Sequence, residues 1–153
     1  MSSLTPFQTV GPYWSIGLGA GIGPLPASYP GTRVVITGRL VDGAGVGIPD
    51  GVLEWWHPVL PCIQRSTTED GGGYCLETIK APHLAIRVLG RGILTHYVTR
   101  LYFADGPDLA GDPVLALVPQ HRRHTLIAQP SSPHRYLFDV IVQGDNETVF
   151  FDI

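Results

Sequence analysis

The sequence predicts an all-β fold, with an antiparallel β-sandwich core preceded by an extended N-terminal arm. Short segments in which apolar and polar residues alternate recur from residue 33 onward. Turn-forming residues separate these segments, and glycine (19) and proline (14) are both frequent among the 153 residues. Stretches with helical periodicity are scarce. Short strands joined by turns are therefore the favoured arrangement.

The chain divides into an arm, residues 1–32, and one β-sandwich domain, residues 33–153. The arm lacks periodicity, and its glycine-rich run Gly17–Pro24 does not predict a regular element. Such a segment is ordered when it lies on another surface. The alternative is a floppy tail, and composition leaves both open. No internal repeat or second domain is evident.

The first strand is expected at residues 33–41, where the side chains alternate between two faces. Val34, Ile36 and Leu40 lie on one face, and Arg33, Thr37 and Arg39 on the other. Further strands are expected at 51–57, 74–80, 83–90 and 94–103. In the strand 51–57, Trp55 and Trp56 point to opposite faces. Turns are expected at 42–45 and 70–73, and Arg91-Gly92 forms the connection between the last two of these strands.

The C-terminal third predicts one long strand at 135–143, a turn at 144–146 and a final strand at 148–151. The segment 113–118 is either a short strand or a helical turn. Asp112 and Pro113 suit the N-cap and first position of a helix. His121 and His124 have helical spacing, but the two arginines between them would repel a cation, so this segment is interpreted as a solvated turn.

Composition excludes several classes of function. Apolar residues make up 44% and charged residues 15%, which allows a packed core and favours burial of surface in a partner. The net charge of −3 gives no basic surface for nucleic acid. No apolar run is long enough to cross a membrane, and Met1-Ser-Ser-Leu4 lacks the features of a signal peptide. Cys62 and Cys75 are expected to be free thiols in a cytoplasmic protein.

The residues by themselves indicate no catalytic centre. The six histidines form no His-x-His or HExxH pattern, and neither CxxC nor Gly-x-Ser-x-Gly is present. Without further information, the sequence describes only a β domain with an unusual arm.

Longer motifs that follow one another along the chain carry a resemblance to a known family. They are Thr5-Pro-Phe-Gln-Thr-Val-Gly-Pro-Tyr13, Asp50-Gly-Val-Leu-Glu-Trp-Trp56, Ala81-Pro-His-Leu-Ala-Ile86, Gly90-Arg-Gly92, Thr99-Arg-Leu-Tyr-Phe103 and Phe138-Asp-Val-Ile-Val-Gln-Gly144. Together they resemble the α chains of the intradiol ring-cleavage dioxygenases, a family that opens aromatic rings with a ferric iron. The chain is shorter than these relatives and lacks insertions after the arm, after Trp56 and after Lys80.

The resemblance implies that this chain does not hold the iron. Catalytic chains of the family bind Fe(III) through two tyrosines and a His-x-His pair, and the positions of that pair are His83 and Ala85 here. The segment after Trp56 contains no tyrosine, and the loop that carries the second tyrosine is missing after Lys80. His83 is then a core or interface histidine. The resemblance therefore implies no catalytic or metal-binding residue in this chain, and an Fe(III) cofactor held by a partner β subunit.

The resemblance also implies a set of substrate-binding residues, which reach the iron pocket of the partner. They are Thr9, Gly11, Pro12, Tyr13 and Arg91. Gly11 permits close backbone approach, Pro12 fixes the direction of the chain, and Arg91 can donate two hydrogen bonds to a substrate carboxylate. Two alternatives stay open: Arg91 is an ordinary surface arginine, or Tyr13 and Trp14 anchor an interface without touching substrate.

The function expected from the resemblance is that of a non-iron-binding α subunit in a heterodimer or larger oligomer. It would complete the active site of an iron-binding β subunit that uses O₂ to cleave 3,4-dihydroxybenzoate to 3-carboxy-cis,cis-muconate. The isolated chain is expected to be inactive, with no nucleic acid or membrane partner. Two alternatives belong to other classes: a stand-alone β-sandwich binding module without activity, and an independent iron enzyme that uses His83, His96 and Tyr102.

Overall fold

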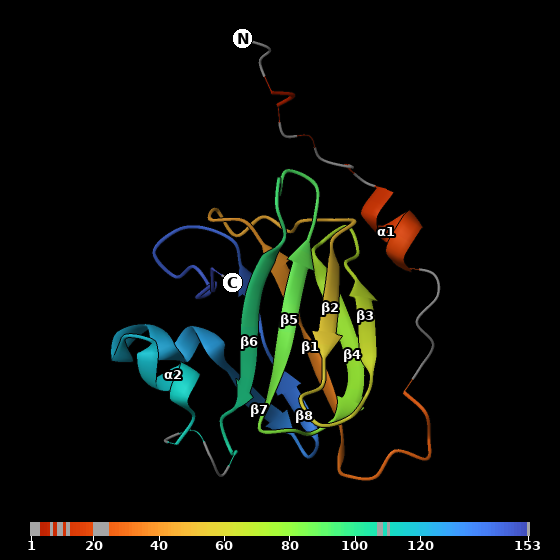
Figure 1. Ribbon diagram of the computed structural model, residues 1–153, viewed down its shortest axis with the longest axis vertical. Helices are drawn as coiled ribbons and strands as arrows, with labels where there is room; N and C mark the ends of the chain where they lie inside the picture. The colour runs from red at the N-terminus through yellow and green to blue at the C-terminus, as the bar shows by residue number, and fades with distance from the viewer. Residues whose placement is uncertain are drawn as a thin grey trace.

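The computed structural model describes residues 4–6, 8, 11, 13–19, 25–106, 109 and 111–152 (Figure 1). Strands dominate the described part of the chain. In order, its elements are α1 (Tyr13–Gly19), β1 (Arg33–Val41), β2 (Val52–Trp56), β3 (Ile63–Thr67), β4 (Gly73–Ile79), β5 (His83–Leu89), β6 (Tyr97–Phe103), α2 (Pro113–Leu117), the 3-10 helix η1 (Gln120–Leu126), β7 (Ile127–Ser132), β8 (Arg135–Leu137) and β9 (Val140–Ile141).

The expected all-β class is confirmed, but the sheet is mixed rather than antiparallel. Hydrogen bonds join the strands in the order β3-β2-β5-β6-β7-β8-β1-β4, and β9 pairs with β1. The pairs β1–β8, β1–β9 and β6–β7 are parallel, and the other pairs are antiparallel. Figure 1 shows β6, β5, β2 and β3 in front of the strands that follow β7 in this order. The expected sandwich is therefore one continuous sheet that folds over itself.

The main hydrophobic core lies between the two halves of this sheet. Trp55, Ile86 and Leu101 enter it from β2, β5 and β6, and Val34 and Ile36 enter from β1. Each of the five is at most 1% exposed. Burial of a side chain of this size contributes about 1.5–3 kcal/mol to stability, so the core supplies much of the driving force for folding.

The polar atom of the buried Trp55 side chain is also satisfied. Its indole Nε1 donates a hydrogen bond to Ser66 Oγ on β3 at 2.9 Å. Trp56, the next residue, is 41% exposed on the outer face. The predicted opposite orientation of the two tryptophans is therefore confirmed, as are the bounds of the first strand, β1.

The prediction of one long strand at 135–143 is wrong, because two residues that are not in a strand, 138 and 139, separate β8 from β9. A Cβ at Gly38 would lie 1.7 Å from the carbonyl oxygen of Phe138, so this glycine permits an unusually close backbone contact. The Tyr74 hydroxyl donates to that same carbonyl. The side chain of Asp139 accepts the backbone N–H of Arg39 at 2.8 Å. These contacts replace ladder hydrogen bonds at the break.

The structure corrects three other expectations for strands. Residues 148–151 are extended but are not a strand, although Phe151 N donates to Val98 O at 2.8 Å. The strand β3 was not predicted, because two of its inward residues are Gln64 and Ser66, so hydrophobic alternation is absent. The strand β7 was not predicted because its sequence, Ile-Ala-Gln-Pro-Ser-Ser, is mostly exposed and contains Pro130.

The described residues form helices at three places, one of them in the arm. Residues 13–19 form α1, so the absence of any regular element in the glycine-rich run was a wrong prediction for its first three residues. For segment 113–118 the helical alternative is confirmed, with Asp112 as N-cap accepting from Val114 N and Leu115 N. His121 and His124 are exposed as expected, although they lie in the 3-10 helix η1 and not in a simple turn.

The sequence also led to expectations about the two cysteines and about segments that could cross a membrane. Cys62 and Cys75 are free, as predicted. Among the described residues, no helix is long and apolar enough to cross a membrane.

Candidate functional site

Arg91 lies in the turn that follows β5, at the end of the molecule where α1 is found (Figure 1). Gly92 has a φ of +80°, which an L side chain rarely adopts, and Ile93 N closes the turn on Gly90 O at 3.2 Å. The Arg91 side chain is 48% exposed and its Nη2 forms an ion pair with the carboxylate of Asp50. The turn therefore exposes the Arg91 guanidinium to solvent, and the ion pair with Asp50 holds one edge of this guanidinium.

Asp50 occupies an unusual backbone position just before β2. Its φ is +56°, a left-handed conformation that aspartate and asparagine tolerate better than most residues. One carboxylate oxygen, Oδ2, contacts Arg91, and the other, Oδ1, accepts a long hydrogen bond of 3.4 Å from Ser15 Oγ in α1. A single carboxylate thus contacts both the predicted substrate arginine and the helix of the arm.

An arginine that is paired with a second carboxylate contacts the other end of α1. Glu54 Oε1 accepts from Arg65 Nε at 2.8 Å and lies 2.6 Å from Arg65 Nη2. The remaining nitrogen, Arg65 Nη1, donates to the carbonyl oxygen of Leu18 at 3.2 Å. The described side chains of α1 include none that is buried. Polar contacts therefore attach α1 to Asp50, just before β2, and to Arg65 on β3.

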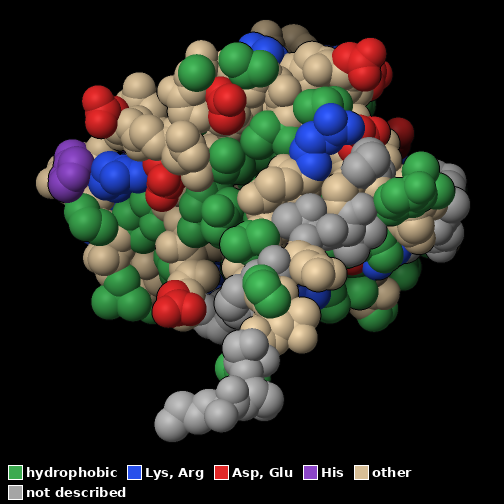
Figure 2. All heavy atoms as spheres, turned by 90° about the horizontal axis from the view of Figure 1, so that it is seen from above, with side chains coloured by type: hydrophobic (Ala, Val, Ile, Leu, Met, Phe, Trp, Pro, Cys, Tyr) green, Lys and Arg blue, Asp and Glu red, His purple; other side chains and the backbone are tan. Residues whose placement is uncertain are grey.

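The structure brings two of the predicted substrate-binding residues to the same end of the molecule. Tyr13 is the first residue of α1 and is 63% exposed, and Arg91 reaches the same helix through Asp50. Figure 2 views this end and shows hydrophobic side chains between separated charged groups. Gly11 has a φ of +66°, and nothing lies within 4 Å of the position that a Cβ would take. Glycine is therefore favoured here by the backbone conformation and not by close packing within this chain. Thr9 and Pro12 lie outside the described residues.

Sequence reasoning missed Asp50 and Ser15 as partners of this site, although a signal was present. Asp50, Glu54 and Trp56 belong to one motif. Glu54 and Trp56 lie on β2, where even spacing places side chains on a common face, and Asp50 lies just before this strand. All three side chains contact an arginine. Asp50 contacts Arg91, Glu54 contacts Arg65 and Arg87, and Trp56 lies beneath the Arg87 guanidinium.

The positions expected to correspond to iron ligands lie at the other end of β5. His83 pairs with Tyr102 on β6, and their ring centroids are 5.8 Å apart. The Tyr102 hydroxyl donates to Asp112 Oδ1 at 2.9 Å. Burial, together with this hydrogen bond and the charge of Asp112, raises the pKa of Tyr102 to about 12.

Two groups of opposite charge, Arg100 and Asp112, lie near His83. Burial lowers the pKa of His83, and the positive charge of Arg100 adds to this effect. Arg100 lies opposite Ala85 in the register of β5 and β6, and its Nη1 is 3.9 Å from Asp112 Oδ2. A guanidinium therefore lies beside the position at which the resemblance implies a second histidine.

The residues present do not fit an iron centre. No group of three or more His, Cys, Asp or Glu that could hold a metal occurs among the described residues. The alternative set of His83, His96 and Tyr102 is not brought together, because His96 precedes β6 whereas Tyr102 lies near its far end. Six strand residues span roughly 20 Å. The described residues therefore do not bring together the three side chains that the alternative of an independent iron enzyme would use.

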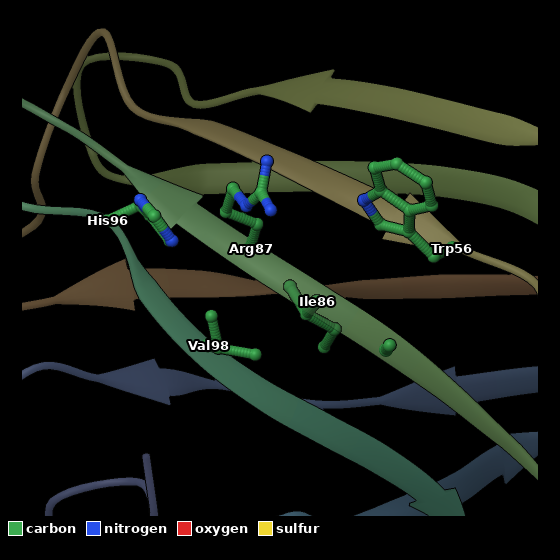
Figure 3. Close-up of a pocket in the computed structure, with 6 residues that line it drawn as sticks. Trp56, Ile86, Arg87, His96 and Val98 are labelled. Carbon is green, nitrogen blue, oxygen red and sulfur yellow. The ribbon is translucent and has the colours of Figure 1, made fainter. Parts of the chain in front are cut away.

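A hollow of about 400 Å³ lies on the outer face between these two ends (Figure 3). It is lined by Trp56, Ala85, Ile86, Arg87, His96 and Val98. Its arginine is already engaged, because the Arg87 guanidinium lies 5.9 Å from the centroid of the Trp56 ring and 3.6 Å from Glu54 Oε2. The hollow thus offers apolar surface rather than an available charge.

Comparison with solved structures defines the class of fold. The chain resembles the dioxygenase domain of a dioxygenase and carbohydrate-binding fusion protein from Streptomyces, with 19% identity, a TM-score of 0.62, and coverage of 93% of this chain and 99% of that one. It also resembles 3-chlorocatechol 1,2-dioxygenase from Rhodococcus opacus, with 18% identity, a TM-score of 0.59, and coverage of 77% and 62%. The fold is that of the intradiol dioxygenases. No family model matches the chain.

Sequence relatives identify the family more narrowly. The protocatechuate 3,4-dioxygenase alpha chain of Burkholderia cepacia is 36% identical over 97% of both chains, and that of Pseudomonas putida is 34% identical over 97% of this chain and 96% of its own. The chain belongs to the family of protocatechuate 3,4-dioxygenase alpha chains. The beta chain of Burkholderia cepacia is also similar, with 26% identity over 77% of this chain and 67% of its own.

The alignments agree with the short loops noted in the sequence. The match to the Burkholderia cepacia alpha chain extends over 197 residues, whereas this chain has 153. The relatives therefore carry insertions that this chain lacks. In this chain β4 and β5 are separated by three residues, 80–82.

Proposed function

We propose that this chain is the non-iron-binding subunit of a heteromeric protocatechuate 3,4-dioxygenase. It completes the active site of an Fe(III)-binding beta subunit that cleaves 3,4-dihydroxybenzoate with O₂ to 3-carboxy-cis,cis-muconate. Family membership supports the reaction, and the similarity to both alpha and beta chains supports an oligomer of the two. The arm, residues 1–32, and the domain, residues 33–153, carry separate parts of this function. The free thiols Cys62 and Cys75 suit the cytoplasm.

The observation that carries the proposal is the separation of two sets of residues along β5. Arg91 follows the C-terminal end of this strand, and His83 is its first residue. A strand from His83 to Leu89 spans roughly 20 Å at about 3.3 Å per residue. An arginine at this distance cannot bind a substrate held beside His83 of the same chain. Arg91 and α1 are therefore suited to serve a pocket that belongs to another subunit.

Within that pocket, Arg91 binds the substrate carboxylate. One edge of its guanidinium faces Asp50, and a planar guanidinium has five N–H donors, so other N–H groups stay free for a second carboxylate. This interaction selects a catechol with a carboxyl substituent and orients its ring. The exposed ring of Tyr13 and the backbone at Gly11 form part of the pocket wall.

The reactive iron belongs to the beta subunit in this proposal. Bound there, it supplies the activation of the catechol for reaction with O₂. The present chain binds and orients the substrate and excludes water from one side. The isolated chain is accordingly inactive, because Arg100 lies opposite Ala85, the position at which the resemblance implies a second histidine.

Metal analysis of the chain purified alone and after co-expression with a beta chain tests the proposal. Iron and cleavage of 3,4-dihydroxybenzoate are expected only in the co-purified complex. Stoichiometric iron in the lone chain would show that the chain is itself the catalyst. A monodisperse monomer that binds no beta chain would instead support a stand-alone binding module.

A further inference from the structure

We infer that Asp50 is a positioning residue that fixes Arg91 and the arm helix α1 relative to each other. This inference rests on the proposed function where it concerns substrate, because it assigns Arg91 to the substrate carboxylate. It begins from the motif Asp50, Glu54 and Trp56, to which the function proposed above assigns no contact with substrate. Asp50 is not expected to touch substrate itself.

The contacts of Asp50 divide between two functional elements. Oδ2 binds Arg91 Nη2, and Oδ1 accepts from Ser15 Oγ at 3.4 Å. Both partners are distant in sequence, since Ser15 is 35 residues before Asp50 and Arg91 is 41 residues after it. Without this carboxylate, the turn that carries Arg91 and the helix that follows Gly11 would have no shared charged contact among the described residues.

The backbone of Asp50 explains why its side chain can reach both. Its left-handed conformation, with a φ of +56°, turns the chain sharply into β2. The 35% exposed carboxylate is therefore neither in the core nor extended into solvent. Asp50 N also donates to Thr68 O at 3.3 Å, and the following Gly51 N donates to Thr68 Oγ1 at 2.8 Å. The carboxylate thus projects from an anchored turn and not from a loose loop.

Holding Arg91 in advance has a physical benefit. Arginine has a long side chain, and fixing its rotamers on binding costs conformational entropy. The ion pair with Asp50 fixes one edge of the guanidinium before substrate arrives and leaves other N–H donors free. Asp50 also reduces the net positive charge that a substrate carboxylate would meet. We expect positioning to outweigh this charge effect, so loss of the Asp50 charge weakens binding.

The test compares Asp50→Asn with Glu77→Gln in the complex with the beta subunit. Asparagine tolerates the same backbone conformation, so D50N removes the charge without a change in backbone preference. The control also removes a carboxylate from an ion pair with an arginine, since Glu77 on β4 contacts Arg33 at 3.0 Å. D50N is expected to raise KM for 3,4-dihydroxybenzoate about tenfold, with little change for unsubstituted catechol, and E77Q is expected to change neither.

A double variant separates positioning from a general loss of structure. If Asp50 acts through Arg91, D50N causes no further rise of KM in a chain that already carries Arg91→Ala. The full tenfold rise in that background would overturn the inference, as would an equal effect on both substrates or a lower KM.

A measurement that does not depend on enzymatic activity keeps the inference testable if the proposed function fails. Amide hydrogen exchange of residues 13–19 is expected to become about tenfold faster in D50N and to stay unchanged in E77Q. If the wild-type complex cleaves no catechol, the proposed function fails while the exchange rates still decide whether Asp50 holds α1. Unchanged exchange in D50N would overturn that part of the inference.

Discussion

Arg91 and His83 lie at opposite ends of strand β5, and each end has a distinct chemical character. At the Arg91 end, an exposed guanidinium is paired with Asp50 beside the arm helix. At the His83 end, a partly buried imidazole lies among Tyr102, Asp112 and Arg100. One end therefore exposes a guanidinium to solvent, and the other is occupied by a network within the chain.

Replacement of Arg91 by alanine should weaken binding of a carboxylated catechol in the αβ complex. Loss of a charge-assisted contact costs about 1.5–3 kcal/mol, which corresponds to a rise in KM of roughly 10- to 150-fold. Steady-state kinetics with 3,4-dihydroxybenzoate and with catechol measure the effect, and Arg91→Lys should retain part of the binding. Equal losses on both substrates would contradict the prediction.

Removal of the arm should impair assembly and activity without unfolding the domain. None of the described side chains of α1 is buried, so a chain that lacks residues 1–19 should lose little thermal stability. Size-exclusion chromatography with the beta subunit and a thermal unfolding scan of the chain alone measure the two effects. A chain that lacks only residues 1–12 keeps α1 and isolates the contribution of the preceding segment. Full assembly and activity of both truncated chains would refute the assigned role of the arm.

Stability should fall as the pH decreases below about 6.5, partly because of His83. Burial and Arg100 lower the pKa of His83 in the folded state below the ordinary value of 6.5. At higher pH the imidazole is neutral in both states and has no effect. Below pH 6.5 the unfolded chain takes up the proton first, which favours unfolding until the lowered folded pKa is reached.

Thermal unfolding of the wild type and of His83→Gln between pH 8 and pH 5 tests this dependence. The variant should lose less stability on acidification than the wild type. Burial also lowers the pKa of His57, so a second variant, His57→Gln, should reduce the pH dependence further. Parallel curves for the wild type and H83Q would exclude His83 as a source.

Gly38→Ala should destabilise the domain strongly. The new methyl group would lie 1.7 Å from the Phe138 carbonyl oxygen and 2.9 Å from the Tyr74 hydroxyl. We expect a loss of about 3 kcal/mol or more in the free energy of unfolding. Gly73→Ala on the paired strand β4 is the matched control, because nothing lies within 4 Å of its added Cβ. Alanine there should stabilise by about 0.5 kcal/mol, and similar effects of both substitutions in denaturant titrations would contradict the explanation.

The elements that could be predicted from sequence are those in which hydrophobic burial dominates. The alternation in β1 predicted its bounds, because Val34, Ile36 and Leu40 enter the core. The strand β3 could not be predicted this way, since its buried residues Gln64 and Ser66 are held by hydrogen bonds to Glu77 O and from Trp55 Nε1. Contacts of this kind depend on partners that are distant in sequence.

The candidate site could be predicted only in part for the same reason. The motif around Arg91 indicated an exposed arginine in a turn, and that position is confirmed. Its role in binding substrate stays a prediction. The sequence motif included Asp50, but the contact of Asp50 with Ser15 depends on the helix α1 in the arm. No periodicity in the arm indicated that helix.

The side-chain amide of Gln64 has a consequence for association with other chains. The strands β3 and β4 are the two ends of the hydrogen-bonded path, so each has an edge without a neighbouring strand in that path. Gln64 Nε2 donates to the carbonyl oxygen of Glu77 at 2.7 Å and thereby joins these two edges. An edge protected in this way is a poor template for strands of other molecules. We therefore expect this contact to disfavour the addition of a strand from another molecule between β3 and β4.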